Sequence, residues 1–158
     1  MIQHNIIDEY SKIINKINSY DIMVQGFFMF GFDNDNNTVF KDTVRAIKEL
    51  DIDDAIMYIL TPYPGTSYFK EFENAGRILT YDWEKYSWWN CVFKPKNMSP
   101  SELEEGLRWS YEQINKYCKK NLVSRMWKYR KRMWENPCIT IKLVKDYCFN
   151  KVDVAKLP

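Results

Sequence analysis

Residues 23–69 read MVQGFFMFGFDNDNNTVFKDTVRAIKELDIDDAIMYILTPYPGTSYF. An apolar run over residues 22–31 leads into a polar loop and a helical pattern, and a second apolar run over 55–60 leads into a proline-bearing loop. Such nearly unbroken runs are typical of parallel strands that are buried on both faces. The stretch therefore contains two consecutive strand–loop–helix units. In such folds the ligand lies where strands end and loops begin, so we place the candidate site just after the two strands.

Each of the two loops carries residues that restrict the backbone. Gly31 ends the first strand and permits close approach of the backbone to whatever lies beyond it. After the second strand comes Thr61-Pro62-Tyr63-Pro64-Gly65-Thr66, whose prolines lack the N–H that a strand ladder needs. The second strand must therefore stop there, and Thr66 or Ser67 is expected to cap the helix that follows.

The remaining chain is mostly helical in pattern. Apolar residues at helical spacing predict a helix over 5–19, and Ser99-Pro100-Ser101-Glu102 is a strong helix start, with a cap, a proline at the first position and a glutamate at the third. Residues 78–98 carry many aromatic side chains and few helical signals, so we expect them to be extended and irregular. Helical spacing continues less cleanly around 123–134, and residues 138–150 favour a helix over a strand.

Composition limits the classes of protein that fit. The chain has 158 residues, 46% of them hydrophobic, and a net charge of +2, which suits one globular domain, or one domain plus an appendage, and gives no argument for nucleic acid. The charged and polar residues 1–20 do not form a signal peptide, and no apolar run reaches the roughly 18 residues of a membrane helix. These features predict a soluble, cytoplasmic protein.

The cysteines and the single histidine give no metal motif. The chain has four cysteines, Cys91, Cys118, Cys138 and Cys148, which form no C-x-x-C pair, and His4 has no partner in the sequence. This spacing argues against a zinc or iron–sulfur site made by this chain alone. A sparse set of thiols also suits a reducing compartment.

The number of strands is small for a parallel α/β fold. Parallel strands need neighbours that cover both faces, and a closed barrel of eight strand–helix units needs about 250 residues. The chain is therefore either a small open α/β domain with a helical tail or part of an incomplete TIM-like barrel. The first helix has no preceding strand, which favours the incomplete barrel.

Four segments together resemble the C-terminal half of radical SAM proteins, of the class that carries a cobalamin-binding domain. They are GFFMFGFDNDNNTVF, ILTPYPGTSYF, AGRILTYDWEKY and VFKPKNMSPSELEEG. The resemblance covers roughly residues 10–115 and implies a partial TIM-like barrel over 1–82 and a mostly helical extension over 83–158. It also implies S-adenosylmethionine as cofactor, with a four-iron four-sulfur cluster that cleaves it to a radical, and cobalamin as a possible further cofactor of the full-length protein.

The resemblance also implies which residues border the site. Residues 28–31 match the fifth strand of the family and residues 60–62 match the sixth. The implied cofactor-binding residues are Gly31, Phe32, Thr61 and Pro62, and those on the substrate side are Tyr63, Pro64 and Trp83. No catalytic residue and no metal ligand is assigned. The chain departs from the family at Asn34, where glycine is usual, and at Asn36-Asn37, which replace threonine and proline.

A larger departure concerns the cluster. The chain contains no C-x-x-x-C-x-x-C, so the resemblance implies that the cluster is held by an N-terminal half, in the same polypeptide or in a split partner. The leading hypothesis is a C-terminal portion of a radical SAM enzyme that is not active alone, with an unknown small-molecule substrate. The alternatives are a non-catalytic interaction module or barrel remnant and, more weakly, an RNA-associated module built on the basic and aromatic residues of 125–134.

Two further patterns have simpler interpretations. Asp33, Asp35 and Asn37 begin like a calcium loop, but the sixth and twelfth positions, Thr38 and Val44, are not the glycine and glutamate that such a loop requires. We interpret the carboxylates as helix caps.

The tryptophans Trp83, Trp88 and Trp89 either cover an apolar substrate or pack the extension onto the barrel, and packing is favoured.

Overall fold

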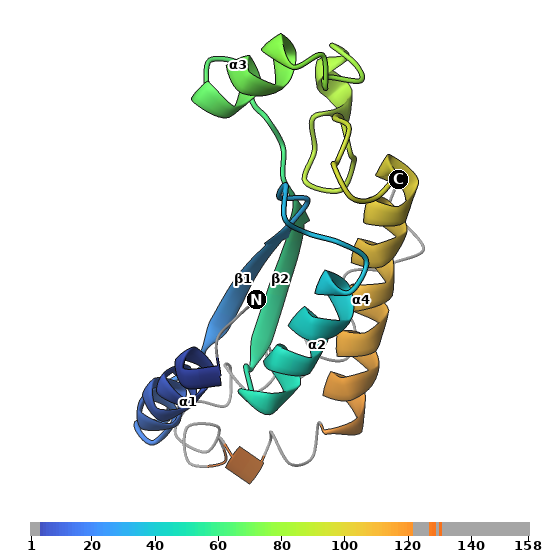
Figure 1. Ribbon diagram of the computed structural model, residues 1–158. Coiled ribbons are helices and arrows are strands. Elements are labelled where there is room, and N and C mark those ends of the chain that lie inside the picture. Colours follow the sequence, from blue (N-terminus) through green and yellow to red (C-terminus); the bar gives the residue numbers. More distant parts are fainter. Residues whose placement is uncertain (1–3, 122–126, 129, 131–158) are drawn as a thin grey trace.

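A computed structural model describes residues 4–121, 127, 128 and 130. The chain is an α/β protein with two parallel strands, four α-helices and one short 3₁₀-helix in this part (Figure 1). The elements follow one another as α1 (His4–Asn18), β1 (Gln25–Phe30), α2 (Val39–Glu49), β2 (Asp54–Ile59), α3 (Ser67–Asn74), η1 (Trp83–Lys85) and α4 (Pro100–Lys120). The expected helices at 5–19 and after Ser99 are confirmed, and residues 78–98 are largely irregular, as expected.

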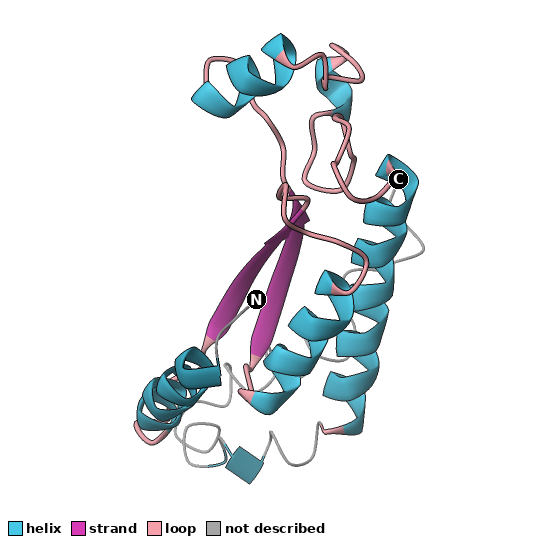
Figure 2. Ribbon diagram, in the orientation of Figure 1, coloured by secondary structure: helices cyan, strands magenta, loops and turns pink. Residues whose placement is uncertain are grey.

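The two strands pair in parallel register, with Phe28 opposite Met57 and Phe30 opposite Ile59. Helix α2 connects them, so β1, α2 and β2 form one strand–helix–strand unit. Figure 2 shows α2 and α4 on the same side of the strands. The hydrophobic core lies between this helical layer and the sheet, and its fully buried side chains include Met57 and Leu103.

The opposite face of the sheet is open, which corrects the expectation of strands buried on both faces. Along β1 the side chains alternate between the core and this open face, so that Phe30 is buried while Phe27 is 63% exposed and Met29 is 45% exposed. In β2, Ile56 and Tyr58 share the open face. The apolar run therefore does not reflect burial on both faces, because one of its two faces has no cover within the described residues.

Local signals mark where helices α3 and α4 begin and where α3 ends, as the sequence predicts. Ser99 and Glu102 form a capping box: the Ser99 N–H donates to Glu102 Oε2 at 2.7 Å and the Glu102 N–H donates to Ser99 Oγ at 3.2 Å. The Phe69 N–H donates to Thr66 Oγ1 at 3.2 Å at the start of α3. Gly76, with φ +63°, lies just past the end of α3.

Parts of the prediction lie outside the described residues. The expected helix over 138–150 and most of 123–134 fall there, as do Cys138 and Cys148. No helix in the described part of the chain combines the length and apolar character that crossing a bilayer requires.

Candidate functional site

The candidate site lies at the ends of β1 and β2 together with the open face of the sheet. The two strand ends are neighbours, since the Leu60 N–H donates to the Phe30 carbonyl at 2.8 Å. Figure 1 shows α3 and the segment around η1 beyond these ends, on the far side from α1. The loops after both strands therefore meet at one edge of the sheet, as the order of elements predicts.

Gly31 is a buried turn residue. Its φ is +102°, and a Cβ added there would lie 3.0 Å from both Leu103 Cδ2 and Phe93 Cζ. The glycine is thus required by the backbone and by core packing. Its N–H and that of Phe32 both donate to Asp35 Oδ2, each at 2.9 Å.

The two acidic residues of this loop do not cap helix α2, which corrects that prediction. Helix α2 begins after Thr38, whose side chain makes no capping bond, and Asp35 instead closes the turn at Gly31. Asp33 pairs with Arg77 at 2.8 Å and with Lys96 at 2.5 Å. The partners lie far away in sequence, which is why local pattern alone did not indicate them.

Asp33, Arg77 and Lys96 form an ion-pair cluster. Arg77 follows α3 and Lys96 precedes α4, so the cluster holds both segments at the end of β1. The hydrogen bond from Lys96 and the guanidinium of Arg77 lower the pKa of the Asp33 carboxyl, against the opposing effect of burial. Arg77 also lies over the ring of Phe72, with its Cζ 4.2 Å from the ring centroid. The extension is therefore fixed over the strand ends by charge and by packing.

Of the candidate cofactor residues, Phe32 is the one with an exposed side chain. Its exposed fraction is 42%, and it lies two residues after the end of β1. The Thr61 hydroxyl is within hydrogen-bonding distance of the Ile59 and Ser87 carbonyls, 3.2 Å from each, and Pro62 is buried. Thr61 and Pro62 thus shape the turn that follows β2.

The residues predicted for the substrate side are accessible. Tyr63 is 42% exposed and Pro64 is exposed. The Trp83 ring packs beside Tyr86, with centroids 4.8 Å apart, while more than half of the side chain remains exposed. It therefore both packs within the extension and presents an apolar surface.

The open face extends the site with residues that the sequence did not single out. The Phe27 and Tyr58 rings stack with centroids 6.3 Å apart, and Tyr58 meets Trp88 edge to face at 5.1 Å. Met29 lies on the same face. An alternation of polar and apolar residues along the strands could have identified this exposed face. Both faces of the strands carry apolar side chains, so the sequence shows no such alternation.

Trp89 is packed, as expected: its ring lies 5.2 Å from that of Tyr111.

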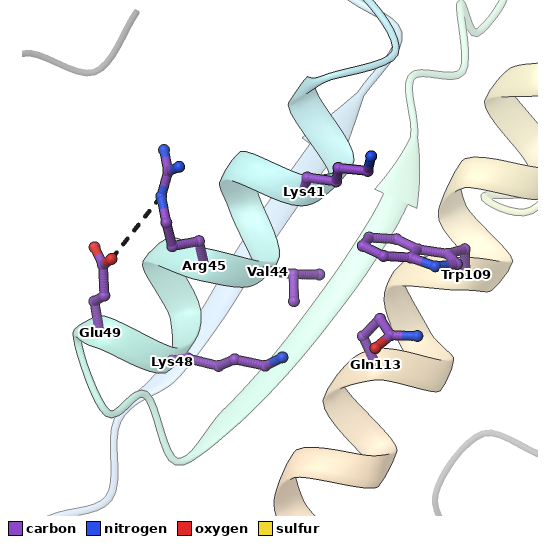
Figure 3. Close-up of a pocket in the computed structure, with 7 residues that line it drawn as sticks. All are labelled: Lys41, Val44, Arg45, Lys48, Glu49, Trp109 and Gln113. Atoms are coloured by element: carbon purple, nitrogen blue, oxygen red, sulfur yellow. Dashed lines mark ion pairs between the residues drawn. The ribbon is translucent and has the colours of Figure 1, made fainter.

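A groove lies elsewhere, between α2 and α4 (Figure 3). It has a volume of about 360 Å³ and is lined by Lys41, Val44, Arg45, Lys48, Glu49, Trp109 and Gln113. Arg45 is paired there with Glu49 at 3.9 Å and also with Asp42. None of the candidate residues lines this groove.

No cluster of metal ligands exists in the described part of the chain. No three Cys, His, Asp or Glu side chains come together there in a way that could hold a metal ion. Cys91 and Cys118 are both buried, and burial raises the pKa of the Cys91 thiol to about 12. An iron–sulfur cluster therefore does not fit the residues that this part of the chain offers.

The basic segment 125–134 is described only at residues 127, 128 and 130. Lys128 pairs with Asp51 at 2.8 Å and with Asp53 at 3.4 Å. Arg130 lies over the Trp127 ring. The alternative to RNA binding is the solvated face of a helix with buried aromatic side chains, but Trp127 is 70% exposed. These contacts leave RNA binding a prediction.

Known proteins with similar sequences confirm the resemblance to radical SAM proteins. The chain is 34% identical over 101 residues to bacteriochlorophyllide d C-12(1)-methyltransferase of Chlorobaculum tepidum, which is 64% of this chain and 22% of that protein. It is 31% identical over 153 residues to bacteriochlorophyllide d C-8(2)-methyltransferase of the same organism, which is 97% of this chain and 32% of that protein. It is 27% identical over 122 residues to anaerobic magnesium-protoporphyrin IX monomethyl ester cyclase of Cereibacter sphaeroides, which is 77% of this chain and 19% of that protein.

The chain thus spans a third or less of the length of these relatives. No family model matches it.

Proposed function

The chain is related to radical SAM proteins, and from this premise we propose that it supplies two strand–helix units of a partial TIM-like barrel, over 1–82, and a helical extension, over 83–158, to a radical SAM enzyme. Its role is to form part of the S-adenosylmethionine and substrate side of that enzyme. The four-iron four-sulfur cluster is held by another part of the protein, and this chain is inactive without it.

The observation that carries the proposal is the one-sidedness of the sheet. Helices cover one face, whereas on the other face Phe27 and Met29 are exposed and Tyr58 is partly covered by Trp88 among the described residues. A barrel has this arrangement, with helices outside and an inward face lined by alternate strand residues. The ends of its strands form the site, and here those ends carry Phe32 and Tyr63.

Each candidate residue has a physical role in this proposal. The exposed rings of Phe32 and Tyr63 offer flat apolar surfaces to the adenine of S-adenosylmethionine and to the substrate. Gly31, Thr61 and Pro62 hold the two turns that present these rings. The Gly31 N–H donates to the Asp35 carboxylate and is therefore not free to bind a ligand. The turn contributes to the site through its shape.

The substrate class follows from the relatives and from the exposed aromatic rings. Two relatives are named for methylating a bacteriochlorophyllide and one for cyclising a magnesium-protoporphyrin ester. We assign this chain a large planar substrate of the same kind, which Trp83 and Pro64 meet at the strand ends. The cofactor supplies the radical, and these side chains orient the substrate and exclude water.

The test uses a chimera in which this chain replaces the matching segment of the C. tepidum C-8(2)-methyltransferase. The chimera and the isolated chain are reconstituted anaerobically, and iron content and binding of S-adenosylmethionine are measured. We expect the isolated chain to take up no iron and the chimera to bind S-adenosylmethionine, whereas the relative lacking the segment does not. Cluster formation by the isolated chain, or a chimera that holds its cluster without binding S-adenosylmethionine, contradicts the proposal.

A further inference from the structure

The groove between α2 and α4 has a bank on α2 that combines charge with an apolar floor. Lys41, Val44 and Lys48 follow one another at spacings of three and four positions, which places them on one face of α2. Figure 3 shows these three side chains directed toward α4, whereas Arg45 and Glu49 point away from it. Val44 is buried, so the two lysines stand at either side of an apolar floor.

The opposite bank, on α4, adds an aromatic ring and further hydrogen-bond donors. Trp109 and Gln113 lie four positions apart and face the α2 bank across the groove (Figure 3). Trp109 is partly buried and packs against the core, which fixes its ring. Its indole N–H and the Gln113 carboxamide make no hydrogen bond with any described residue. The groove therefore offers a flat apolar surface with unused donors beside it.

The charges that face the groove are positive and have no counter-charge. Among the described residues Lys41 makes no ion pair or hydrogen bond, and Lys48 meets only the Tyr117 ring, with its Nζ 5.7 Å from the ring centroid. Arg45 is different, because Asp42 and Glu49 balance its charge. The surplus of positive charge complements an anionic partner.

The surroundings of the groove limit where such a partner lies. The adjoining hollow toward the start of α4 shares Lys41 and Trp109 with the groove, but it is also lined by Glu102 and Glu105. These carboxylates repel an acidic segment, so it is favoured between Lys41 and Lys48 and disfavoured beyond Lys41. The two lysines lie seven positions apart on one helix, which is about 10 Å along its axis. A second helix presents the same spacing when two of its acidic residues are seven positions apart.

We infer that the groove between α2 and α4 docks an amphipathic helix of a separate protein. Two acidic residues of that helix, seven positions apart, pair with Lys41 and Lys48, and an apolar side chain between them lies on Trp109. A separate protein is the source because the groove opens away from the sheet: Figure 3 shows β2 behind the two helices. The groove is remote from the strand ends, so the inference goes beyond the proposed function and does not depend on it.

The experiment titrates a fluorescein-labelled helical peptide with the full chain and follows fluorescence anisotropy. The peptide carries two glutamates seven positions apart, leucine in the turn between them, and otherwise alanine and glutamine. We expect saturable binding that weakens as the sodium chloride concentration rises. The double variant Lys41→Glu/Lys48→Glu should bind at least about tenfold more weakly, because two attractive pairs become repulsive. The matched control is Lys12→Glu on the exposed surface of α1, which should leave the affinity unchanged.

A charge swap separates specific pairing from a general loss of binding or of fold. The double variant should bind a peptide with lysines in place of the two glutamates more tightly than the wild type does. A peptide whose glutamates are four positions apart should bind the wild type more weakly than the peptide with seven. The absence of saturable binding to the wild type at about 1 mM overturns the inference. Equal affinities of the double variant and Lys12→Glu, or a charge swap without rescue, overturn it as well.

The source of the docked helix is tested by the same titration of the chimera with the C. tepidum methyltransferase. Binding of the peptide to the chimera supports a separate protein, because the groove is then still accessible in the longer protein. Loss of binding in the chimera overturns that part of the inference, since the rest of the protein then covers the groove. An RNA oligonucleotide that displaces the peptide, and that the double variant no longer binds, overturns the inference in favour of nucleic acid.

Discussion

Replacing Tyr111 by phenylalanine tests how the β2 edge is held. The Tyr111 hydroxyl satisfies both the N–H and the carbonyl of Met57, and both residues are buried. Its removal leaves two buried backbone groups unpaired, each of which costs about 1–3 kcal/mol. Because the ring still fills its site, we expect Tyr111→Phe to lower the free energy of unfolding by the sum of these two costs, about 2–6 kcal/mol.

Equilibrium unfolding in urea, followed by far-ultraviolet circular dichroism, measures this loss. The matched control is Tyr20→Phe, because Tyr20 is 68% exposed and its hydroxyl makes no hydrogen bond in the described part of the chain. The control should stay within about 0.5 kcal/mol of the wild type. If Tyr111→Phe is as stable as the control and the Met57 amide stays equally protected from exchange, the reasoning about the hydrogen bonds between Tyr111 and Met57 is refuted.

The same hydroxyl gives a dependence on pH. Burial raises the pKa of Tyr111 from 10.0 to about 12. In the unfolded chain the phenol ionises near its ordinary pKa, so the contribution of Tyr111 is complete below about pH 10 and is lost as the pH rises toward 12. The stability difference between wild type and Tyr111→Phe should therefore shrink across this range in urea titrations, and a difference that grows with pH would contradict the assignment.

Three other substitutions or reactions test the site. Gly31→Ala places a Cβ at a positive φ and within 3.0 Å of core atoms, and it should lower the free energy of unfolding in urea by about 2–4 kcal/mol. The control Gly65→Ala has a positive φ but open space around the Cβ, and it should cost only about 1–2 kcal/mol. Equal costs would refute the packing argument. Asp33→Asn should destabilise the chain by about 1–2 kcal/mol at pH 7, and because the pKa of Asp33 is lowered in the folded state, this loss should fade as the pH falls through that lowered value; a pH-independent difference would count against it. Cys91, with a pKa of about 12, should resist alkylation by iodoacetamide at pH 8 until the chain unfolds, as read by peptide mass spectrometry; labelling at the rate of a free thiol would show that it is accessible.

The sequence allowed the local features of the fold to be predicted. The capping box at Ser99 and Glu102, the Thr66 cap and the glycine after α3 each depend on residues within a few positions of one another. The order of strands and helices also placed both loops at one edge of the sheet. These predictions held because short-range geometry decides them.

The features that the sequence did not predict depend on contacts between residues that are distant in the chain. The sequence predicts that Asp33 caps a helix, but its partners Arg77 and Lys96 come from later segments. Tyr111 fits the apolar stripe of its helix, and nothing local indicates that its hydroxyl closes a strand 54 positions earlier. Open and buried faces were indistinguishable in β1 because both carry apolar side chains.

The most direct test of the central claim is the affinity of the chimera for S-adenosylmethionine, measured by equilibrium dialysis for the parent chimera and for Phe32→Ala, Tyr63→Ala and Tyr20→Ala. If this chain forms the cofactor and substrate side of a radical SAM enzyme, Phe32→Ala weakens binding by about fivefold or more, as expected for the loss of one aromatic contact. Tyr63→Ala weakens it by a similar or smaller factor, and Tyr20→Ala leaves it unchanged. Equal affinities for all four proteins would contradict the claim.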